Sequence, residues 1–138
     1  MNETEIQAMI KRHEGYRESI YYDTVGIPTG GYGHAFHPGS SLPKAIWEEV
    51  FYRDYRRSVE DYECLDLDLD PVRKAVVVDM LFNLGLPKMF KFKNTLGAMR
   101  NKDWERAAQG MEKSRWYGQV RTRAVELVRM MRTGKVEA

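Results

Sequence analysis

Two carboxyl groups and a hydroxyl lie within one short glycine-rich stretch, residues 14–34. Glu14 follows a helix-like opening of the chain, and Asp23 and Thr29 come next among four closely spaced glycines. Hydrolysis of a glycosidic bond needs a protonated carboxyl group for the leaving oxygen and an ionised one to activate water or attack the sugar. Acidic residues in ordinary turns produce a similar pattern, so the residue types alone leave both interpretations open.

The elements that must position these side chains can be read from the flanking residues. Residues 3–13 carry apolar side chains at helical spacing, with Asn2 or Thr4 available as a cap, so we predict a helix that ends near Glu14. The following segment is too rich in glycine to be helical, and its tyrosines favour strands. We therefore expect Glu14 at a helix end and Asp23 and Thr29 on a β-hairpin or small sheet.

The spacing of these residues resembles that of a known family. The pattern E-x(8)-D-x(5)-T, with Thr29-Gly30-Gly31-Tyr32-Gly33-His34 at its end, closely resembles the phage-type lysozymes, the endolysin family that includes T-even phage lysozyme. Further motifs follow in the order of that family along most of the chain: Asp70-Pro-Val-Arg73, Phe82-Asn83-Leu84-Gly85, Phe92-Lys-Asn94-Thr95, Trp104-Glu-Arg-Ala-Ala108 and Ser114-Arg115-Trp116-Tyr117 with Arg123.

The resemblance implies an α+β, mostly helical, lysozyme-like fold with two lobes in a single domain spanning residues 1–138. A small lobe at about 14–50 would carry the β-hairpin sheet. A helical lobe would combine residues 1–13 with about 60–138, and a long helix would join the lobes. The segment between His34 and that helix is much shorter than in T-even phage lysozyme. We therefore expect that side of the cleft to be more open, and the family's substrate contacts from the small lobe do not transfer directly.

The remaining helices are predicted from their caps and apolar spacing. A helix over about 42–64 would be capped by Ser40 or Ser41, with Pro43 in its first turn. Residues 65–70 alternate like a strand, but we expect an exposed connector. Residues 71–84 predict a buried helix with Asp70 as N-cap and Gly85 as C-cap. Short helices should follow, starting at Asn94 or Thr95, at Asp103 and at Ser114. A last helix should span about 120–132 and stop at Gly134.

The same resemblance implies an activity and a set of site residues. It implies hydrolysis of the β-1,4 bond between N-acetylmuramic acid and N-acetylglucosamine in peptidoglycan, with inversion. Glu14 would be the general acid, Asp23 and Thr29 would hold the attacking water, and Arg123 would form an ion pair with Glu14. The other implied substrate-side residues are Tyr32, His34, Phe82, Asn83 and Thr95. The resemblance implies neither a metal ion nor an organic cofactor.

Charge is unevenly distributed along the chain. Residues 1–70 hold 7 basic and 14 acidic side chains, whereas residues 71–138 hold 15 basic and 6 acidic ones. The basic half can attract an anionic polymer, for which the carboxylates of peptidoglycan and nucleic acid are both candidates, or it can be a solvated helical surface. We expect peptidoglycan as the partner, no nucleic acid and a monomer.

Composition also bears on localisation. The single cysteine, Cys64, excludes an intrachain disulfide, and no signal peptide or membrane-spanning run is visible. We expect synthesis in the host cytoplasm, no stable membrane association, and action on the cell wall after release through a holin, with lysis of the host.

Three other functions stay open at this point. A wall-binding module without turnover would keep the fold but would not need Glu14, Asp23 and Thr29 together. A lytic transglycosylase would use Glu14 to make an anhydro product without needing Asp23. Nucleic-acid binding by the basic half has no recognition motif behind it.

Overall fold

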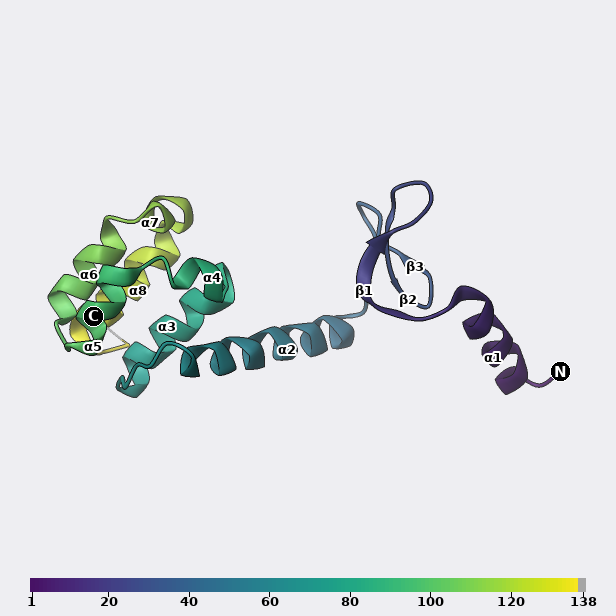
Figure 1. Cartoon of the computed structure of the whole chain (residues 1–138), viewed down its shortest axis with the longest axis horizontal. Helices are drawn as coiled ribbons and strands as arrows, with labels where there is room; N and C mark the ends of the chain where they lie inside the picture. The colour runs from purple at the N-terminus through teal and green to yellow at the C-terminus, as the bar shows by residue number, and fades with distance from the viewer. Residues whose placement is uncertain (137–138) are drawn as a thin grey trace. The chain divides into compact units, whose positions relative to one another are not determined.

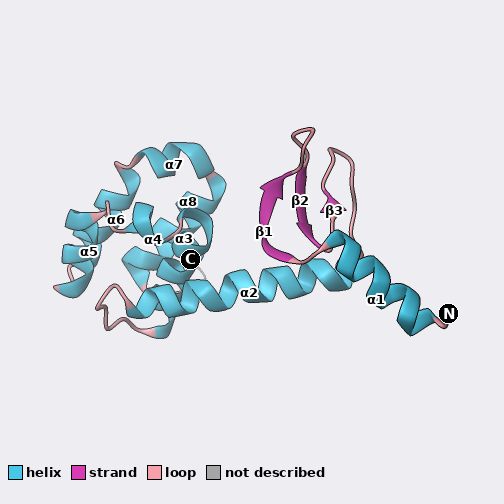
Figure 2. Ribbon diagram, turned by 45° about the vertical axis from the view of Figure 1, so that its right-hand side comes forward, coloured by secondary structure: helices cyan, strands magenta, loops and turns pink. Residues whose placement is uncertain are grey.

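The computed structural model describes residues 1–136 as eight helices and a small antiparallel sheet (Figures 1 and 2). This confirms the predicted α+β, mostly helical class. The chain divides into two compact units: unit 1 is Met1–Lys44, and unit 2 begins at Ala45. The predicted boundaries of the lobes stay predictions. Within residues 1–136, no helix combines the length and the apolar character that a membrane crossing requires.

Unit 1 begins with helix α1, Glu3–Glu14. Asn2 caps it: the Asn2 side chain accepts a hydrogen bond from the Glu5 amide at 2.9 Å, and the Glu5 carboxylate accepts one from the Asn2 amide at 3.2 Å. This reciprocal capping box satisfies two amides at the start of the helix. Gly15 ends the helix with φ 72°, which places Glu14 at its last position.

A three-stranded sheet follows in the order β1-β2-β3, with β1 Arg17–Tyr22, β2 Pro28–Gly31 and β3 His34–Ala35. All pairs are antiparallel, and Figure 2 shows the strands side by side in magenta. Thr29 lies in the central strand, opposite Tyr21 on one side and Ala35 on the other. The predicted small sheet carrying Thr29 is therefore confirmed.

The long helix α2 runs from Lys44 to Glu63. Its predicted caps are wrong, because the helix starts after Pro43 and the Ser40 hydroxyl accepts a hydrogen bond from the His37 amide inside the preceding loop. Of its side chains only Ser58 and Tyr62 are buried. Much of the apolar face that the spacing predicts is consequently exposed within unit 2, including Trp47 and Phe51.

Residues 65–70 connect α2 to the next helix without regular structure. The prediction of an exposed connector is wrong for Leu65, which is completely buried, and Leu67 and Leu69 also pack against the core. The Tyr62 hydroxyl donates to Leu67 O and accepts from Leu69 N, both at 3.3 Å. The strand-like alternation therefore reflects an irregular segment whose leucines, but not its aspartates, are turned toward the core.

Helix α3, Pro71–Leu84, is the central element of unit 2 and begins and ends where the caps predict. Asp70 accepts a hydrogen bond from the Arg73 amide, and Gly85 ends the helix with φ 82°. Five shorter helices follow: α4 Leu86–Met89, α5 Lys93–Arg100, α6 Trp104–Glu112, α7 Arg115–Val120 and α8 Thr122–Thr133.

Two of the predicted starts among these shorter helices are confirmed. Asp103 caps α6 and Ser114 caps α7, each through a side-chain hydrogen bond to a helix amide. The other two are off: α5 begins at Lys93 rather than at Asn94 or Thr95, and α8 begins at Thr122 rather than near residue 120.

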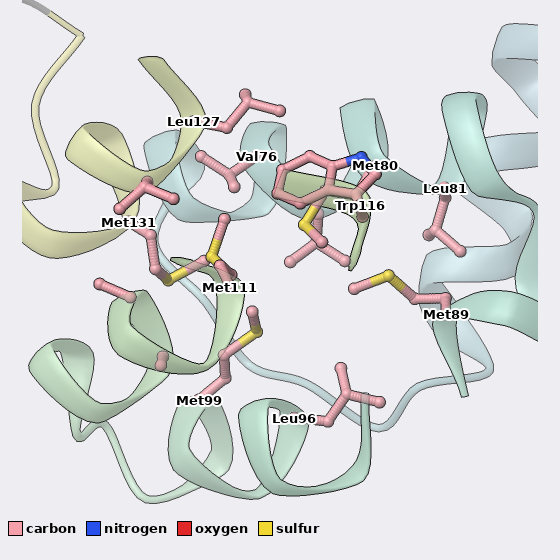
Figure 3. Close-up of a cluster of buried hydrophobic side chains, with 14 of the residues drawn as sticks. Val76, Met80, Leu81, Met89, Leu96, Met99, Met111, Trp116, Leu127 and Met131 are labelled. Atoms are coloured by element: carbon pink, nitrogen blue, oxygen red, sulfur yellow. The ribbon is translucent and has the colours of Figure 1, made fainter. Parts of the chain in front are cut away.

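The core of unit 2 lies among α3, α5, α6 and α8 and is rich in methionine (Figure 3). Five methionine side chains are fully or almost fully buried: Met80, Met89, Met99, Met111 and Met131. Trp116 is buried beside them, which confirms its prediction as a core residue. Its indole N–H donates to Asn83 Oδ1 at 2.9 Å, so the only polar atom of the buried ring has a hydrogen-bond partner.

The Asp70 cap leads to a prediction about stability and pH. Burial raises the pKa of the Asp70 carboxyl, but hydrogen bonds from the Arg73 guanidinium and amide outweigh it and leave that pKa below its ordinary value. A lowered folded-state pKa stabilises the protein above the pKa of the unfolded carboxyl, and this contribution disappears as pH falls through the folded value. We expect Asp70→Ala to cost about 1 kcal/mol at neutral pH through loss of the cap.

Asp70→Asn keeps an acceptor for the cap but has no charge to lose. The free energy of unfolding of Asp70→Asn should therefore fall furthest below that of wild type near neutral pH, and the difference should shrink below about pH 4. Urea unfolding at pH 6 and at pH 3 measures the difference in unfolding free energy at each pH. Asp68→Asn, at an exposed aspartate, is the matched control. A deficit that is the same at both pH values would contradict the assigned Asp70–Arg73 pairing.

Candidate active site

Glu14 places its carboxylate against the turn between β2 and β3. Gly33 in that turn has φ 71°, and a β-carbon there would lie 2.5 Å from Glu14 Oε2 and 3.1 Å from Glu14 Cδ. Both the backbone conformation and the close approach of the carboxylate therefore require glycine at position 33. The Glu14 side chain is held beside the sheet yet stays exposed within unit 1.

Asp23 stands at the end of the hairpin that joins β1 to β2. Its Oδ1 accepts hydrogen bonds from the amides of Val25 and Ile27, each at 2.9 Å, and its own amide donates to Ile27 O at 2.9 Å. One carboxylate oxygen is thus fixed by the turn. The other, Oδ2, has no hydrogen-bond partner among residues 1–136. Asp23 therefore presents one anchored and one open oxygen.

Thr29 is buried in the central strand, with only 4% of its surface exposed. Its hydroxyl donates to Ile27 O at 2.8 Å, the same carbonyl that accepts from the Asp23 amide. Asp23 and Thr29 are therefore both bonded to Ile27 and have fixed positions relative to each other. Since the Thr29 proton is already donated, its oxygen is left as an acceptor for any further partner.

Tyr32 and His34 lie at the other end of the sheet. The Tyr32 ring packs 5.1 Å from the Tyr16 ring, and Lys11 Nζ lies 5.2 Å from its centroid. His34 pairs with Gly30 across the strands, and its ring lies nearly perpendicular to the Phe36 ring with the two ring centroids 4.8 Å apart. Both side chains are exposed, so unit 1 offers them to solvent beside Gly33.

In unit 2, three of the predicted site residues have partners from their own unit. Arg123 Nε lies 2.7 Å from Asp79 Oδ1, and its Nη2 donates to Asp79 O at 3.3 Å. Phe82 packs 5.4 Å from the Phe51 ring, and Asn83 accepts the Trp116 indole proton. The predicted ion pair between Arg123 and Glu14 joins the two units and stays a prediction.

Among the hollows on the surface of unit 2, two lie beside predicted site residues. The first is an apolar groove of about 490 Å³ along α2 and α3, lined by Phe51, Tyr55, Val78 and Phe82 among others. The second, of about 580 Å³, is here called the basic groove. Its lining includes Thr95 and five cations: Lys88, Lys91, Lys93, Lys113 and Arg115. No acidic side chain lines the basic groove, so its lining carries a net positive charge that attracts anions.

Comparison with known proteins identifies the chain. The sequence model of the phage lysozyme family matches residues 11–130, which include every predicted site residue. The chain belongs to the phage lysozyme family. The matched range starts before Glu14 and runs through the glycine-rich stretch, both grooves and most of α8. Membership makes the chain a glycoside hydrolase of the lysozyme class, in agreement with the resemblance described above.

Individual phage lysozyme relatives are distant in sequence. Two probable T4-type lysozymes of Dictyostelium discoideum are 26% and 25% identical, each aligned over 96% of this chain and 96% of its own length. The pre-baseplate central spike protein Gp5 of Enterobacteria phage T4 is 29% identical over 94% of this chain. The chain spans only 28% of the length of that spike protein.

Reasoning from the sequence missed some of the residues that shape the candidate site. Ile27, which ties Asp23 to Thr29, has no polar side chain and acts only through its backbone. Asp79 is paired across 44 positions, so no local pattern marks it as the partner of Arg123. Gly110 lines the basic groove, and its one signal in the sequence is its position within a helix whose backbone does not require glycine.

Proposed function

We propose that this phage lysozyme cleaves the β-1,4 bond between N-acetylmuramic acid and N-acetylglucosamine in bacterial peptidoglycan, with inversion at the anomeric carbon. Glu14 donates its proton to the oxygen of the leaving sugar. A water molecule attacks the opposite face of the sugar and loses a proton to Asp23. The product then carries a new hydroxyl, Glu14 is ionised and Asp23 is protonated, so exchange of one proton restores the starting state.

The observation that carries this proposal is the hydrogen bonding of Asp23 and Thr29. Asp23 Oδ2 is an open acceptor, and the Thr29 hydroxyl has already donated its proton to Ile27 O. Two acceptors fixed to one backbone residue can hold the two protons of a single water. The lone pair of that water is then directed away from them, toward an electrophile. Inversion needs room for this water, typically about 6.5–9.5 Å between the two carboxyl groups.

Other predicted residues take supporting roles in this proposal. Tyr32, Phe82 and Asn83 are proposed contacts for sugar rings, and exposed aromatic rings such as Tyr32 and Phe82 suit the apolar faces of sugars. His34 is proposed to support the sheet beside Glu14. Arg123 is proposed to form an ion pair with Glu14 and to give up one of its interactions with Asp79 when it does so.

The biological role that we propose is lysis of the host cell at phage release. The enzyme would be made in the cytoplasm and reach the wall through a holin. Co-expression with a holin in a bacterial host tests this: lysis should need both proteins. Lysis without the holin would contradict the proposed route. Similarity to a spike protein makes a tail-associated role the alternative, which predicts that the protein is found in purified virions.

Product analysis tests the reaction itself. Purified peptidoglycan digested by the wild-type protein should yield fragments with a reducing muramic end in mass spectrometry. Early proton spectra should show the α-anomer first, since a β bond is cleaved with inversion. Anhydro-muramic products would instead identify a transglycosylase and leave Asp23 without its role. Binding to the wall with no products would favour the wall-binding module.

A further inference from the structure

The segment that joins α4 to α5 presents one aromatic ring to solvent. Phe90 ends α4, where its amide donates to Leu86 O at 3.0 Å, and the residue is 44% exposed. The neighbouring apolar side chains point inward: Met89 has no exposed surface, and Phe92 packs against the core with its ring 6.5 Å from the Trp116 ring. These two inward side chains fix the backbone around Phe90, so its ring stays outside.

Cations accompany this ring in the sequence and across the basic groove. Three of them belong to the same segment and two to the junction of α6 and α7: Lys88, Lys91, Lys93, Lys113 and Arg115. All five are exposed, and none belongs to a salt bridge among residues 1–136. The acidic neighbour of Lys113, Glu112, contacts Arg132 on α8 at 2.6 Å instead. The positive charge of the groove therefore has no counter-charge in its own lining.

An exposed ring among unpaired cations favours a membrane surface as the partner. A phenylalanine ring gains free energy when it leaves water for the boundary between lipid headgroups and acyl chains. Lysines beside it can lay their apolar stems along that boundary while their ammonium groups stay at the lipid phosphates. An anionic leaflet attracts each such cation over about a Debye length. Residues 88–93 supply both kinds of interaction within six positions.

The residue types favour lipid over nucleic acid. Four of the five cations are lysines, which attract phosphate as point charges and lack the planar fork with which arginine binds a single phosphate. Stacking of single-stranded bases uses successive aromatic rings, whereas in residues 88–93 only the Phe90 ring is exposed. A fluid layer of lipid phosphates requires neither arrangement.

We propose that Phe90 and the cations of the basic groove bind reversibly to the surface of an anionic phospholipid membrane. The ring enters the headgroup region, and the cations lie against the lipid phosphates. The binding is weak, because even one acyl chain of a lipid anchor holds a protein only marginally. It uses neither Glu14 nor Asp23, so the inference does not rest on the proposed cleavage of peptidoglycan. Its consequence is a higher concentration of the enzyme at such a membrane than in the surrounding solution.

Sedimentation of the full chain with lipid vesicles tests the inference. Wild type should bind vesicles made of equal parts of phosphatidylglycerol and phosphatidylcholine, and should bind phosphatidylcholine alone much more weakly. Salt at about 1 M, where the Debye length is about 3 Å, should release it. Lys91→Gln should weaken the binding about fivefold, as expected for one cation at an anionic surface. Phe90→Ala should weaken it about tenfold through loss of the inserted ring. Equal binding to both kinds of vesicle would overturn the inference.

Matched variants separate insertion of the ring from general attraction between charges. Phe51→Ala removes the same ring from α2, where it is 52% exposed, and Lys44→Gln removes an exposed lysine outside the basic groove. Both should bind anionic vesicles as wild type does. Phe90→Trp should also bind, and brominated lipids should quench the fluorescence that it adds to that of wild type. Wild-type binding by Phe90→Ala would leave only adsorption of charge and would contradict the proposed role of the ring.

Two further measurements distinguish the other partners. Purified walls contain no membrane, so Phe90→Ala should clear them at the wild-type rate, and a loss there would assign Phe90 to the substrate instead. A DNA oligonucleotide should compete poorly with the vesicles at the same salt concentration. Tighter binding of the oligonucleotide than of the vesicles would make nucleic acid the partner in place of lipid. If wild type bound anionic vesicles as described but cleared no walls, the proposed function would fail and this inference would stand.

Discussion

Replacing Glu14 by glutamine should lower the clearing of purified walls by about 10²- to 10⁴-fold, which is the range for loss of a general acid. Glutamine has nearly the same shape as glutamate, so it can still lie against Gly33 at the end of α1. It has no acidic proton, and the leaving oxygen would then have to depart without protonation. Turbidity of a wall suspension over time measures the loss.

Two controls make this result specific. Glu18→Gln changes an exposed carboxylate on β1 of the same unit and should leave the clearing rate unchanged. Circular dichroism and thermal unfolding of Glu14→Gln should match those of wild type, because the Glu14 side chain is exposed. Clearing by Glu14→Gln at the wild-type rate would remove Glu14 from the proposed mechanism.

Truncation of Met80 to alanine should destabilise the protein by about 2–5 kcal/mol, the range for large-to-small changes in a packed core. Met80 lies on α3 with no exposed surface, among the side chains of Figure 3. Removing its thioether opens a cavity that the surrounding helices can fill only in part. The free energy of unfolding, measured in urea, reports the loss.

The matched controls test packing rather than residue identity. Met80→Leu conserves most of the volume and should cost less than about 1.5 kcal/mol. Val125→Ala removes an apolar group from α8 that is 52% exposed, and its effect should stay within about 0.5 kcal/mol. A loss below about 1 kcal/mol for Met80→Ala would mean that this part of the core is loosely packed.

Features that depend on neighbouring residues could be predicted from the sequence. Asp70 with Pro71, Ser114 and Gly85 mark helix ends through contacts three or four positions away. The glycine-rich stretch likewise indicated the sheet that carries Thr29 and the turn that holds Asp23. Each of these features is decided by backbone geometry over a few residues, which local residue types reveal.

Features that depend on distant partners could not be predicted in the same way. Ser40 is a good cap by type, but its hydroxyl is occupied by the His37 amide, and α2 starts later. Leu65 looked exposed among aspartates because burial depends on what packs over it. The hydrogen bond between Asn83 and Trp116 joins residues 33 positions apart. It occupies Asn83 Oδ1, so Asn83 has fewer hydrogen-bonding atoms free for a ligand than its position beside Phe82 suggested.

The methionines at the centre of unit 2 make the long-term stability of the enzyme sensitive to oxidants. A thioether adapts to irregular space, but its oxidation to the sulfoxide turns an apolar group into a polar one. Five such groups are sealed from solvent while the unit is folded, so peroxide reaches them only when the helices open. Each oxidised chain then refolds less readily, because a sulfoxide dipole must be buried without a partner. Oxidative ageing of this protein is therefore expected to follow the fraction of molecules in which the helical unit is open, and variants that stabilise the folded unit should also keep longer in air.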